Sequence, residues 1–538
     1  MKLVPMSTNC SESEFDVIIL GGGSAGYAAA RTAASLGARV AVVEGGPDVG
    51  GLCILRGCMP SKTLLESSYR WHEIMRARQF GLDVKPGAPI VKEIIARKRT
   101  LIGEFADYRR SQLEAGKFTF YRATARFADA HTLELTPVAR DSGAGAVPAT
   151  IRGKTFVITT GSEISPPRIP GLKEAGYLTS DTALDNETLP DSIIVLGGGV
   201  IAVELGQYYS HLGSKVTLIQ RSERILKEND DDVSAVIEKA FRDEGVALYT
   251  STSLIDVTTC PEGKTVRFTH EGVEKSVTAQ EILYALGREP RVRDLNLPAA
   301  GVELTAKGKA IAVDNGMRTS APHIFAAGDV VGLYEVVHVA ISQGECAAWN
   351  AVQLLRGDAG KTPNVTLHAG SGPVGLPGVG AGDFSPGSHA HAEPAGVQPC
   401  DEVTGKAPCA ARTMDYRLKT TVTFTHPEIA SVGLTEKEAI AAGIAYKAAK
   451  YPFDDHGKSQ IMGALYGFVK VLAEPTRGEI IGAHIVGPHA SDLIHELIAV
   501  MYFRGTVKDL ALIPHYHPTL AEIVTYPAEE LAEEFGLV

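Results

Sequence analysis

Long apolar runs are missing from this 538-residue chain, and no stretch reaches the length of a membrane-spanning helix. The first 14 residues hold no apolar core of signal-peptide length, so we expect a cytoplasmic protein that does not bind membranes. Positive charge is in the minority, and the net charge of −11 gives no support to nucleic-acid binding. Seven cysteines in so long a chain do not make a disulfide framework. The remaining composition, 44% hydrophobic and 21% charged, is typical of a globular protein with several domains.

A dinucleotide-binding signature lies near the start of the chain. The apolar segment Phe15–Leu20 leads into Gly21, Gly23 and Gly26, which have the spacing of a glycine-rich turn that opens a helix. Glu44 ends the next apolar segment, where an acid can meet the ribose of a bound nucleotide. The pattern predicts a strand, a phosphate-binding turn and a helix.

The same unit recurs 176 residues later. This shift carries the three glycines of the first turn onto Gly197, Gly199 and Ala202. Two such units in register predict two dinucleotide sites on one polypeptide. We therefore expect an α/β fold with two doubly wound, Rossmann-like domains.

The second unit differs from the first where nucleotide specificity is decided. Gln220 stands at the position that corresponds to Glu44, and Arg221 follows it. Without a carboxylate at position 220, nothing repels a 2′-phosphate, and the Arg221 guanidinium supplies an opposite charge. The sequence therefore favours NADPH, which carries this phosphate, over NADH. The alternative is that Arg221 and the nearby Arg224 are ordinary solvated surface charges.

Cys53 and Cys58 are the most informative pair, because they closely follow the first nucleotide unit. Taken alone, two cysteines separated by four residues could be a metal half-site or two unrelated thiols. Their place in the chain favours a dithiol that exchanges electrons with a bound cofactor.

Residues 357–413 are rich in glycine, proline and alanine, and we interpret them as an inserted loop. His389, His391, Cys400 and Cys409 lie there, but their spacing fits no zinc signature, so we assign no metal site. From Tyr416 onward, alternating segments predict an antiparallel sheet with helices. One predicted helix, residues 490–500, would place Leu493, Leu497 and Val500 on one face.

Together these motifs resemble the flavin-dependent pyridine-nucleotide disulfide oxidoreductases, a family that includes dihydrolipoamide dehydrogenase, glutathione reductase and mercuric reductase. The resemblance covers most of the chain and rests on the following segments: Gly21–Gly26, Gly50–Lys62, Thr159–Gly161, Gly197–Ala202, Ala285–Pro290, Ile324–Asp329, His426–Gly433 and His515–Glu522.

The resemblance implies two Rossmann-like domains followed by an α+β dimerisation domain. The expected boundaries are residues 1–166 and 296–356 for the two parts of the FAD domain and 167–295 for the NAD(P) domain. The inserted loop would span residues 357–413, and the dimerisation domain residues 414–538.

The resemblance also implies roles for the residues near the flavin. The first turn would hold FAD, with Glu44 on its ribose and Asp329 on its ribityl side. Cys53 would be the interchange thiol that faces the substrate, and Cys58 would lie against the flavin. Further expected contacts are Lys62 paired with Glu204 near the flavin, Thr160 and Gly161 beside the cofactors, and Gly287 at the NAD(P) site.

His517 and Glu522 would carry the proton chemistry. A leaving sulfur needs a proton, and an imidazole held by a carboxylate titrates in the right range. In the family this pair reaches the cysteines of the other subunit, so a homodimer is expected, with His515 in a supporting place.

The substrate that the resemblance implies is a small dithiol or disulfide like dihydrolipoamide, free or carried on a lipoyl domain. Arg31 matches one of the arginines with which glutathione reductase holds carboxylates, but Glu345 occupies the position of another. The nucleotide site instead resembles those of glutathione and mercuric reductases. Two alternatives stay open: an NADPH-dependent reductase of another disulfide, a metal ion or a quinone, or transhydrogenation; and a non-catalytic, redox-sensing flavoprotein.

Overall fold

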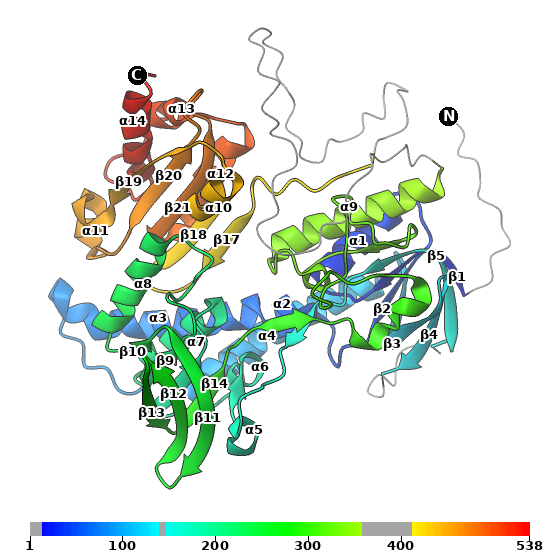
Figure 1. The fold of residues 1–538 in the computed structure, drawn as a ribbon, viewed down its shortest axis with the longest axis horizontal. Helices are drawn as coiled ribbons and strands as arrows, with labels where there is room; N and C mark the ends of the chain where they lie inside the picture. The colour runs from blue at the N-terminus through cyan, green and yellow to red at the C-terminus, as the bar shows by residue number, and fades with distance from the viewer. Residues whose placement is uncertain (1–12, 139–146, 358–410, 538) are drawn as a thin grey trace.

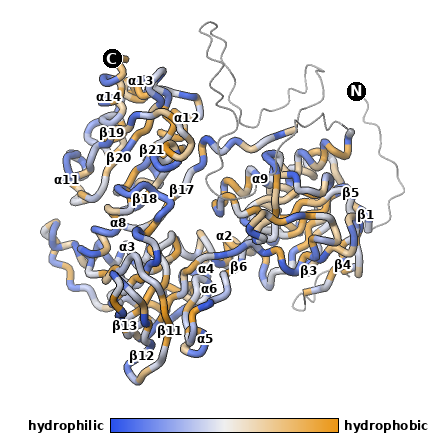
Figure 2. The backbone as a smooth tube through the Cα atoms, viewed as in Figure 1, coloured by the Kyte–Doolittle hydropathy of each residue, from blue (hydrophilic) through white to orange (hydrophobic). Residues whose placement is uncertain are grey.

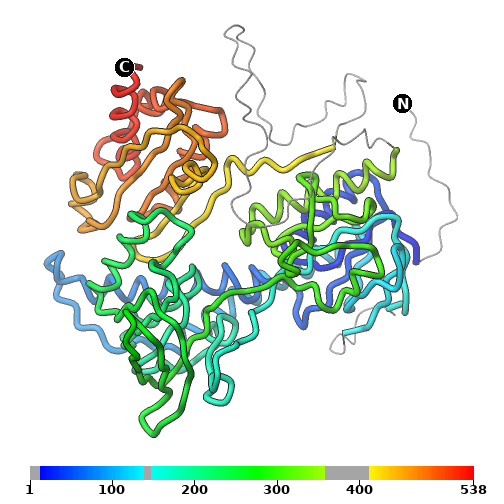
Figure 3. Tube along the Cα trace, viewed as in Figure 1, coloured from blue at the N-terminus to red at the C-terminus, as the bar shows by residue number. Residues whose placement is uncertain are grey.

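The computed structural model describes residues 13–138, 147–357 and 411–537, which form three parts, each built on a sheet (Figure 1). The trace in Figure 3 runs through the first part, crosses to the second, returns to the first and enters the third last. The expected inserted loop lies almost wholly outside the described residues, as do His389, His391, Cys400 and Cys409.

The sheet of the first part has β1 (Glu14–Leu20) at its centre, parallel to β2 (Val40–Glu44) on one side and β5 (Thr150–Ile158) on the other. The other strands are β3 (Thr119–Asp129) and β16 (Ile324–Ala326), both parallel, and the antiparallel β4 (Thr132–Pro137). Helices α1 (Ser24–Ser35) and α9 (Val337–Leu355) pack on each other beside it. In the sequence, β5 precedes the second nucleotide unit and β16 follows it. Because the two strands pair, the chain returns to this sheet after it has formed the second part.

The second part contains a parallel sheet in the order β10-β9-β8-β14-β7. Its strands are β7 (Leu178–Thr179), β8 (Ser192–Leu196), β9 (Lys215–Ile219), β10 (Ala247–Tyr249) and β14 (Glu281–Tyr284). The accompanying helices are α7 (Val200–Leu212) and α8 (Asp231–Asp243). An antiparallel sheet of β11 (Thr252–Cys260), β12 (Gly263–His270) and β13 (Val273–Ala279) completes this part.

The third part is an antiparallel sheet in the order β17-β18-β21-β20-β19, as the alternating segments predicted. Its strands are β17 (Thr420–Thr423), β18 (Glu428–Gly433), β19 (Lys447–Pro452), β20 (Phe468–Ala473) and β21 (Ile480–Gly487). The predicted helix is present as α12 (Ala490–Tyr502), but its buried face is Ala490, Ile494, Leu497 and Met501. The prediction placed Leu493 and Val500 on that face, whereas both are only partly buried at its edges.

Three helices connect the first two parts: α2 (Gly51–Leu55), α3 (Cys58–Arg76) and α4 (Val91–Glu114). α3 packs along α7, and Leu64 of α3 shares a buried cluster with Val203 of α7. The remaining α-helices are α5 (Leu172–Ala175), α6 (Ser180–Ala183), α10 (Glu436–Ala442), α11 (Gly457–Met462), α13 (Val507–Leu512) and α14 (Thr525–Glu534), and the remaining strands are the short β6 (Ser162–Ile164) and β15 (Arg288–Pro290).

Hydrophobic stretches coincide with the strands of each sheet in Figure 2. The first and third parts have buried clusters of their own, and the cluster of the second part extends to Ile429, Phe468 and Val486 of the third. Among the described residues, no helix combines the length and apolar character needed to cross a bilayer. The architecture is the one predicted, two doubly wound α/β parts and a third α+β part.

Candidate active site

The first glycine-rich turn connects β1 to α1 with almost no free space. Gly21 has a φ of +108°, and a Cβ on Gly26 would lie 1.8 Å from the carbonyl oxygen of Gly21, so only glycine fits there. Glu44 accepts hydrogen bonds from the backbone N–H of Gly22 (2.7 Å) and of Gly46 (2.6 Å). The turn therefore presents the N-terminus of α1 and a carboxylate at one edge of the sheet, which suits a dinucleotide.

Asp329, Thr160 and Gly161 lie at the same edge, just beyond β16 and β5. Ser162 Oγ donates to Asp329 Oδ2 at 2.7 Å, and this bond fixes the direction of the carboxylate. Thr160 Oγ1 donates to the carbonyl oxygen of Arg291 at 2.7 Å, so this hydroxyl supports the backbone.

The two cysteines lie on consecutive helices. Cys53 is in α2 and half-buried, and Cys58 is the first residue of α3. Hydrogen bonding from the Cys53 thiol, together with the charge of Lys62 acting against burial, lowers the pKa of Cys58 to about 6. The same interaction with Cys58, followed by burial, raises the pKa of Cys53. The pair therefore carries one thiolate near neutral pH, at Cys58.

Lys62 lies one turn beyond Cys58 in α3, and its Nζ is 2.7 Å and 2.9 Å from the two carboxylate oxygens of Glu204 in α7. The Glu204 side chain is 4% exposed and also accepts from the backbone N–H of Phe424 at 2.9 Å. The ion pair that the resemblance implied is thus present, and through Glu204 it links the connecting helix α3 to the second and third parts of the chain.

The second glycine-rich turn repeats the geometry of the first. Gly197 has a φ of +119°, and a Cβ there would lie 2.4 Å from the carbonyl oxygen of Ala285. A Cβ on Gly199, in contrast, would have no heavy atom of the described residues within 4 Å. Ala202 is fully buried in α7. Gly287, at a φ of +115°, also borders open space. The turn can accept a second dinucleotide.

The residues expected to select the nucleotide follow β9. Arg221 is exposed there, whereas Arg224 is 2.8 Å from the buried carboxylate of Glu238. The Gln220 side chain contacts local backbone, accepting from the N–H of Arg221 at 3.1 Å. The structure therefore separates the two arginines: Arg224 is held by an acid, and Arg221 faces solvent.

His517 and Glu522 form a hydrogen-bonded pair, with His517 Nδ1 at 2.9 Å from Glu522 Oε2. The imidazole is 78% exposed, whereas the carboxylate is largely buried. The other Glu522 oxygen is 3.3 Å from Nε2 of His456, a buried residue that the sequence analysis missed. His515 pairs instead with Glu496 at 2.8 Å.

Within the described part of one subunit, no hydrogen bond or ion pair joins His517 to Cys53 or Cys58.

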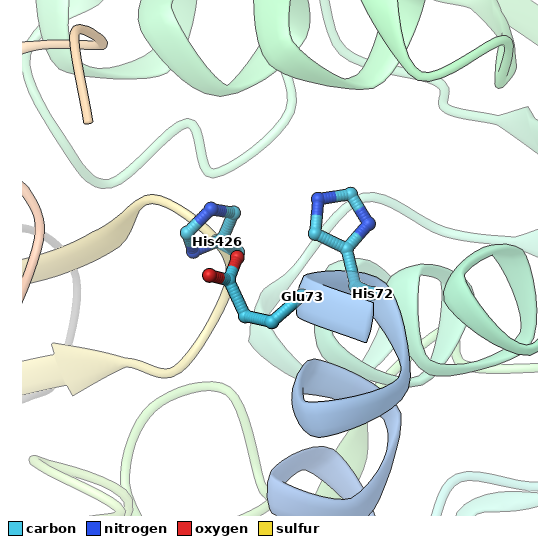
Figure 4. A group of neighbouring side chains, drawn as sticks. All are labelled: His72, Glu73 and His426. Atoms are coloured by element: carbon cyan, nitrogen blue, oxygen red, sulfur yellow. The ribbon is translucent and has the colours of Figure 1, made fainter. Parts of the chain in front are cut away.

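Three histidines lie where α3, α7 and the turn between β17 and β18 meet. The rings of His72 and His211 are stacked with centroids 4.0 Å apart, and the ring of His426 is 5.4 Å from His72. Figure 4 shows Glu73 extending from α3 toward His426, with the ring of His72 to one side. Burial, reinforced by the neighbouring His211, lowers the pKa of His72 to about 3 and that of His426 to about 4. The imidazoles of His72 and His426 are therefore neutral at physiological pH.

The chain combines two nucleotide-binding turns, a pair of cysteines and a third, antiparallel part. This combination defines a class of protein, and comparisons with known proteins agree. The family described as pyridine nucleotide-disulphide oxidoreductase matches residues 15–344, and the dimerisation domain of that family matches residues 420–528. The chain belongs to this family. It is a flavoprotein oxidoreductase, and its dimerisation domain supports a homodimer.

Two kinds of relative are about equally similar to the chain. A mercuric reductase of Lysinibacillus sphaericus is 31% identical over 95% of this chain and 82% of its own length. A dihydrolipoyl dehydrogenase of Geobacillus stearothermophilus is 31% identical over 96% of each chain. Among solved structures, LpdA of Mycobacterium tuberculosis has a TM-score of 0.75 at 26% identity, covering 96% of this chain and 99% of its own.

The family uses FAD and NAD(P)H, and the residues present fit both. Glu44, the first turn and Asp329 lie at one sheet edge for FAD, and the second turn is open at Gly199 for NAD(P)H.

Proposed function

We propose that the protein passes electron pairs between NAD(P)H and a small dithiol or disulfide of the dihydrolipoamide kind, through Cys53 and Cys58. The main support for this proposal is the position of the Cys58 thiol at the start of α3, near Lys62, and its pKa of about 6. A thiolate stabilised at this place, with a second thiol in contact, is the chemistry that dithiol–disulfide exchange needs.

Residues of the chain would hold FAD at the first turn, with Glu44 on the ribose and Asp329 on the ribityl side. When bound, FAD supplies electron transfer between the nicotinamide and the enzyme disulfide. The Lys62 ammonium, oriented by the buried Glu204 carboxylate, keeps a positive charge beside the Cys58 sulfur.

The exchange begins at Cys53, whose thiol keeps its proton near neutral pH. His517 of the partner subunit, held by Glu522, takes that proton, and the resulting Cys53 thiolate attacks one sulfur of the substrate disulfide, so that a mixed disulfide forms. The other substrate sulfur leaves as a thiolate, and His517 gives the proton to it. The Cys58 thiolate then attacks Cys53, which restores the enzyme disulfide and releases the second substrate sulfur.

NADPH is the nucleotide that this proposal favours. Gln220 lacks the carboxylate that would accept a ribose hydroxyl and repel a phosphate, and Arg221 is exposed next to it. The neighbouring Arg224 is already paired with Glu238, so Arg221 would carry the recognition.

A second candidate is reduction of a metal ion, because mercuric reductases of 31–32% identity match as well as dihydrolipoyl dehydrogenases do. The motif at His515–Glu522, with a histidine paired to a carboxylate at 2.9 Å, favours the disulfide substrate. A metal ion would not need this proton donor for a leaving sulfur.

The experiment is a comparison of turnover with lipoamide, glutathione disulfide and Hg²⁺, each with NADPH and with NADH. We expect the lipoyl disulfide to exceed glutathione disulfide, because Glu345 would repel a carboxylate of the larger substrate. Rapid reduction of glutathione disulfide would overturn the substrate assignment. Hg²⁺ turnover that far exceeds that of both disulfides would favour the second candidate.

A further inference from the structure

Two histidines and a carboxylate come together near the C-terminal ends of α3, α7 and α8. His72 lies in the second half of α3, His211 in the last turn of α7, and Glu244 directly after α8. One possible ligand atom from each residue lies within 4.8 Å of the other two. Because α3 begins at Cys58, roughly 20 Å of helix separates His72 from that cysteine. The cluster is therefore distinct from the redox site.

The imidazole of His211 has a buried nitrogen without a hydrogen bond. The side chain is 5% exposed, and its Nε2 atom finds no hydrogen-bond partner among the described residues. This nitrogen lies 3.3 Å from Oε2 of Glu244. Two ligands that are each about 2.0–2.1 Å from a tetrahedral zinc ion lie about 3.3 Å apart as well. Buried polar atoms normally have a partner, so Nε2 indicates a bound group between the two side chains.

The Glu244 carboxylate is oriented but not neutralised. Nε2 of Gln207 donates to its two oxygens, at 3.1 Å and 3.4 Å, and Gln207 also forms two hydrogen bonds with the backbone of His426. Within the described part of the chain, Glu244 forms no ion pair with a lysine or an arginine. In metal sites, such hydrogen bonds hold a ligating carboxylate in place. The negative charge of Glu244 is therefore available to a cation.

An acidic cluster elsewhere in the molecule differs in this respect. Asp230, Asp232 and Glu436 form another group of possible metal ligands. The Nζ atom of Lys470 lies 2.8 Å, 2.9 Å and 2.8 Å from Asp230, Asp232 and Glu436, in that order. The lysine supplies the positive charge there, and the acidic cluster needs no metal ion.

A second pair of stacked histidines differs as well. The rings of His131 and His323 have centroids 4.3 Å apart. Nδ1 of His131 lies 3.0 Å from the carbonyl oxygen of Gly153, and Nε2 of His323 lies 2.7 Å from that of Ala130. Each ring of this pair thus has a backbone partner, so stacking alone does not explain the buried nitrogen of His211.

We propose that His72, His211 and Glu244 bind a divalent metal ion of the zinc kind, which fastens α3 to the second part of the chain. Two imidazole nitrogens and a carboxylate oxygen suit Zn²⁺, whereas Mg²⁺ and Ca²⁺ prefer oxygen ligands. The fourth position would go to water or to His426, which forms a neighbouring group with His72 and Glu73 (Figure 4). This ion is resident in the fold and is distinct from any metal ion reduced at the cysteines.

The test measures metal binding by the oxidised holoenzyme after dialysis against EDTA. Equilibrium dialysis with Zn²⁺, followed by elemental analysis, should give one ion per subunit, and Mg²⁺ should not bind. X-ray absorption at the zinc edge should show nitrogen and oxygen ligands at about 2.0 Å and no sulfur at about 2.3 Å. Zn²⁺ should also raise the melting temperature, because it binds the folded chain in preference to the unfolded one.

Substitution of a ligand should weaken this binding. In His211→Gln and in Glu244→Gln we expect the affinity for Zn²⁺ to fall at least about tenfold, and the rise in melting temperature to shrink. His131→Gln removes a histidine from the other stacked pair and should bind Zn²⁺ as the wild type does. Glu244→Gln keeps the size of the side chain, so it decides the question if His211→Gln does not fold.

Three results would overturn the inference. They are the absence of Zn²⁺ binding, equal affinity in the wild type and the ligand variants that fold, and sulfur at about 2.3 Å from the ion, which would place it at cysteines. Binding is measured without turnover, so this site can be absent while disulfide exchange stands, and it can be present if disulfide exchange fails.

Discussion

Lys62 Nζ lies 2.7 Å from Glu204 Oε2, although 142 residues separate the two in the sequence. The contact joins α3, which begins at Cys58, to α7, which begins at the second nucleotide turn. One ion pair therefore connects the thiolate side of the site to the NAD(P) side.

The charge of Lys62 should set the pH at which the Cys58 thiolate forms. Since Lys62 lowers the pKa of Cys58, Lys62→Met should raise that pKa above its value of about 6. In the reduced holoenzyme, a pH titration of the long-wavelength thiolate–flavin absorption should then shift to higher pH. Lys62→Arg, which keeps the charge, should shift the titration less; an unchanged titration in Lys62→Met would exclude this electrostatic role.

The active site should require both subunits. Cys53→Ser and His517→Gln homodimers should each be nearly inactive in disulfide reduction. Random mixing of the two chains makes half of the dimers hybrids with one intact site each, so about one quarter of wild-type activity should return in the mixture and about one half in the purified hybrid. Co-expression with two different affinity tags and assay of the purified hybrid tests this. A hybrid as inactive as both parents would place His517 and the cysteines of one site in the same subunit.

Arg221 should determine the preference for NADPH. Arg221→Leu should raise the KM for NADPH roughly tenfold, because one charged contact is worth about 1.5 kcal/mol, and it should leave the KM for NADH nearly unchanged. Lys227→Gln removes a neighbouring exposed cation and serves as the control. Equal effects of the two substitutions would mean that general electrostatics, not Arg221, selects the nucleotide.

The histidines at the junction of the three parts should make stability sensitive to acid. The pKa values of His72 and His426 are held near 3 and 4, below the ordinary value of about 6.5. Below pH 6.5 the unfolded chain therefore binds protons that the folded chain does not, and stability falls as the pH decreases toward 4.

Melting temperatures between pH 7 and pH 5 measure this effect. His72→Phe keeps a ring against His211 without a titrating group, and it should lose less stability on acidification than the wild type. His495→Gln, which removes an exposed histidine outside the cluster, should behave like the wild type. A parallel decline in all three proteins would remove the histidine cluster as the cause.

Much of the fold could be predicted because short sequence patterns, each within a few residues, specify its nucleotide-binding turns. The spacing of Gly21, Gly23 and Gly26 specifies a turn by itself, and the repeat at Gly197 specifies the second one. The face of α12 was predicted less well. Burial follows Ile494 and Met501 because the sheet beneath that helix, not periodicity alone, decides which neighbouring apolar residue points inward.

Other parts of the site depend on packing between distant segments. His456 has no spacing relation to His517, yet it lies 3.3 Å from the same carboxylate, Glu522. The pairing of Arg224 with Glu238 is of the same kind, and it leaves Arg221 as the available cation.

The most direct test of the central claim is an anaerobic titration of the purified protein with NADPH while the visible spectrum is recorded. We predict a yellow protein that develops a long-wavelength absorption band after uptake of two electrons, and loss of that band in Cys58→Ser. A protein that stays colourless after reconstitution with FAD, or that gives the same band with and without Cys58, would contradict the account.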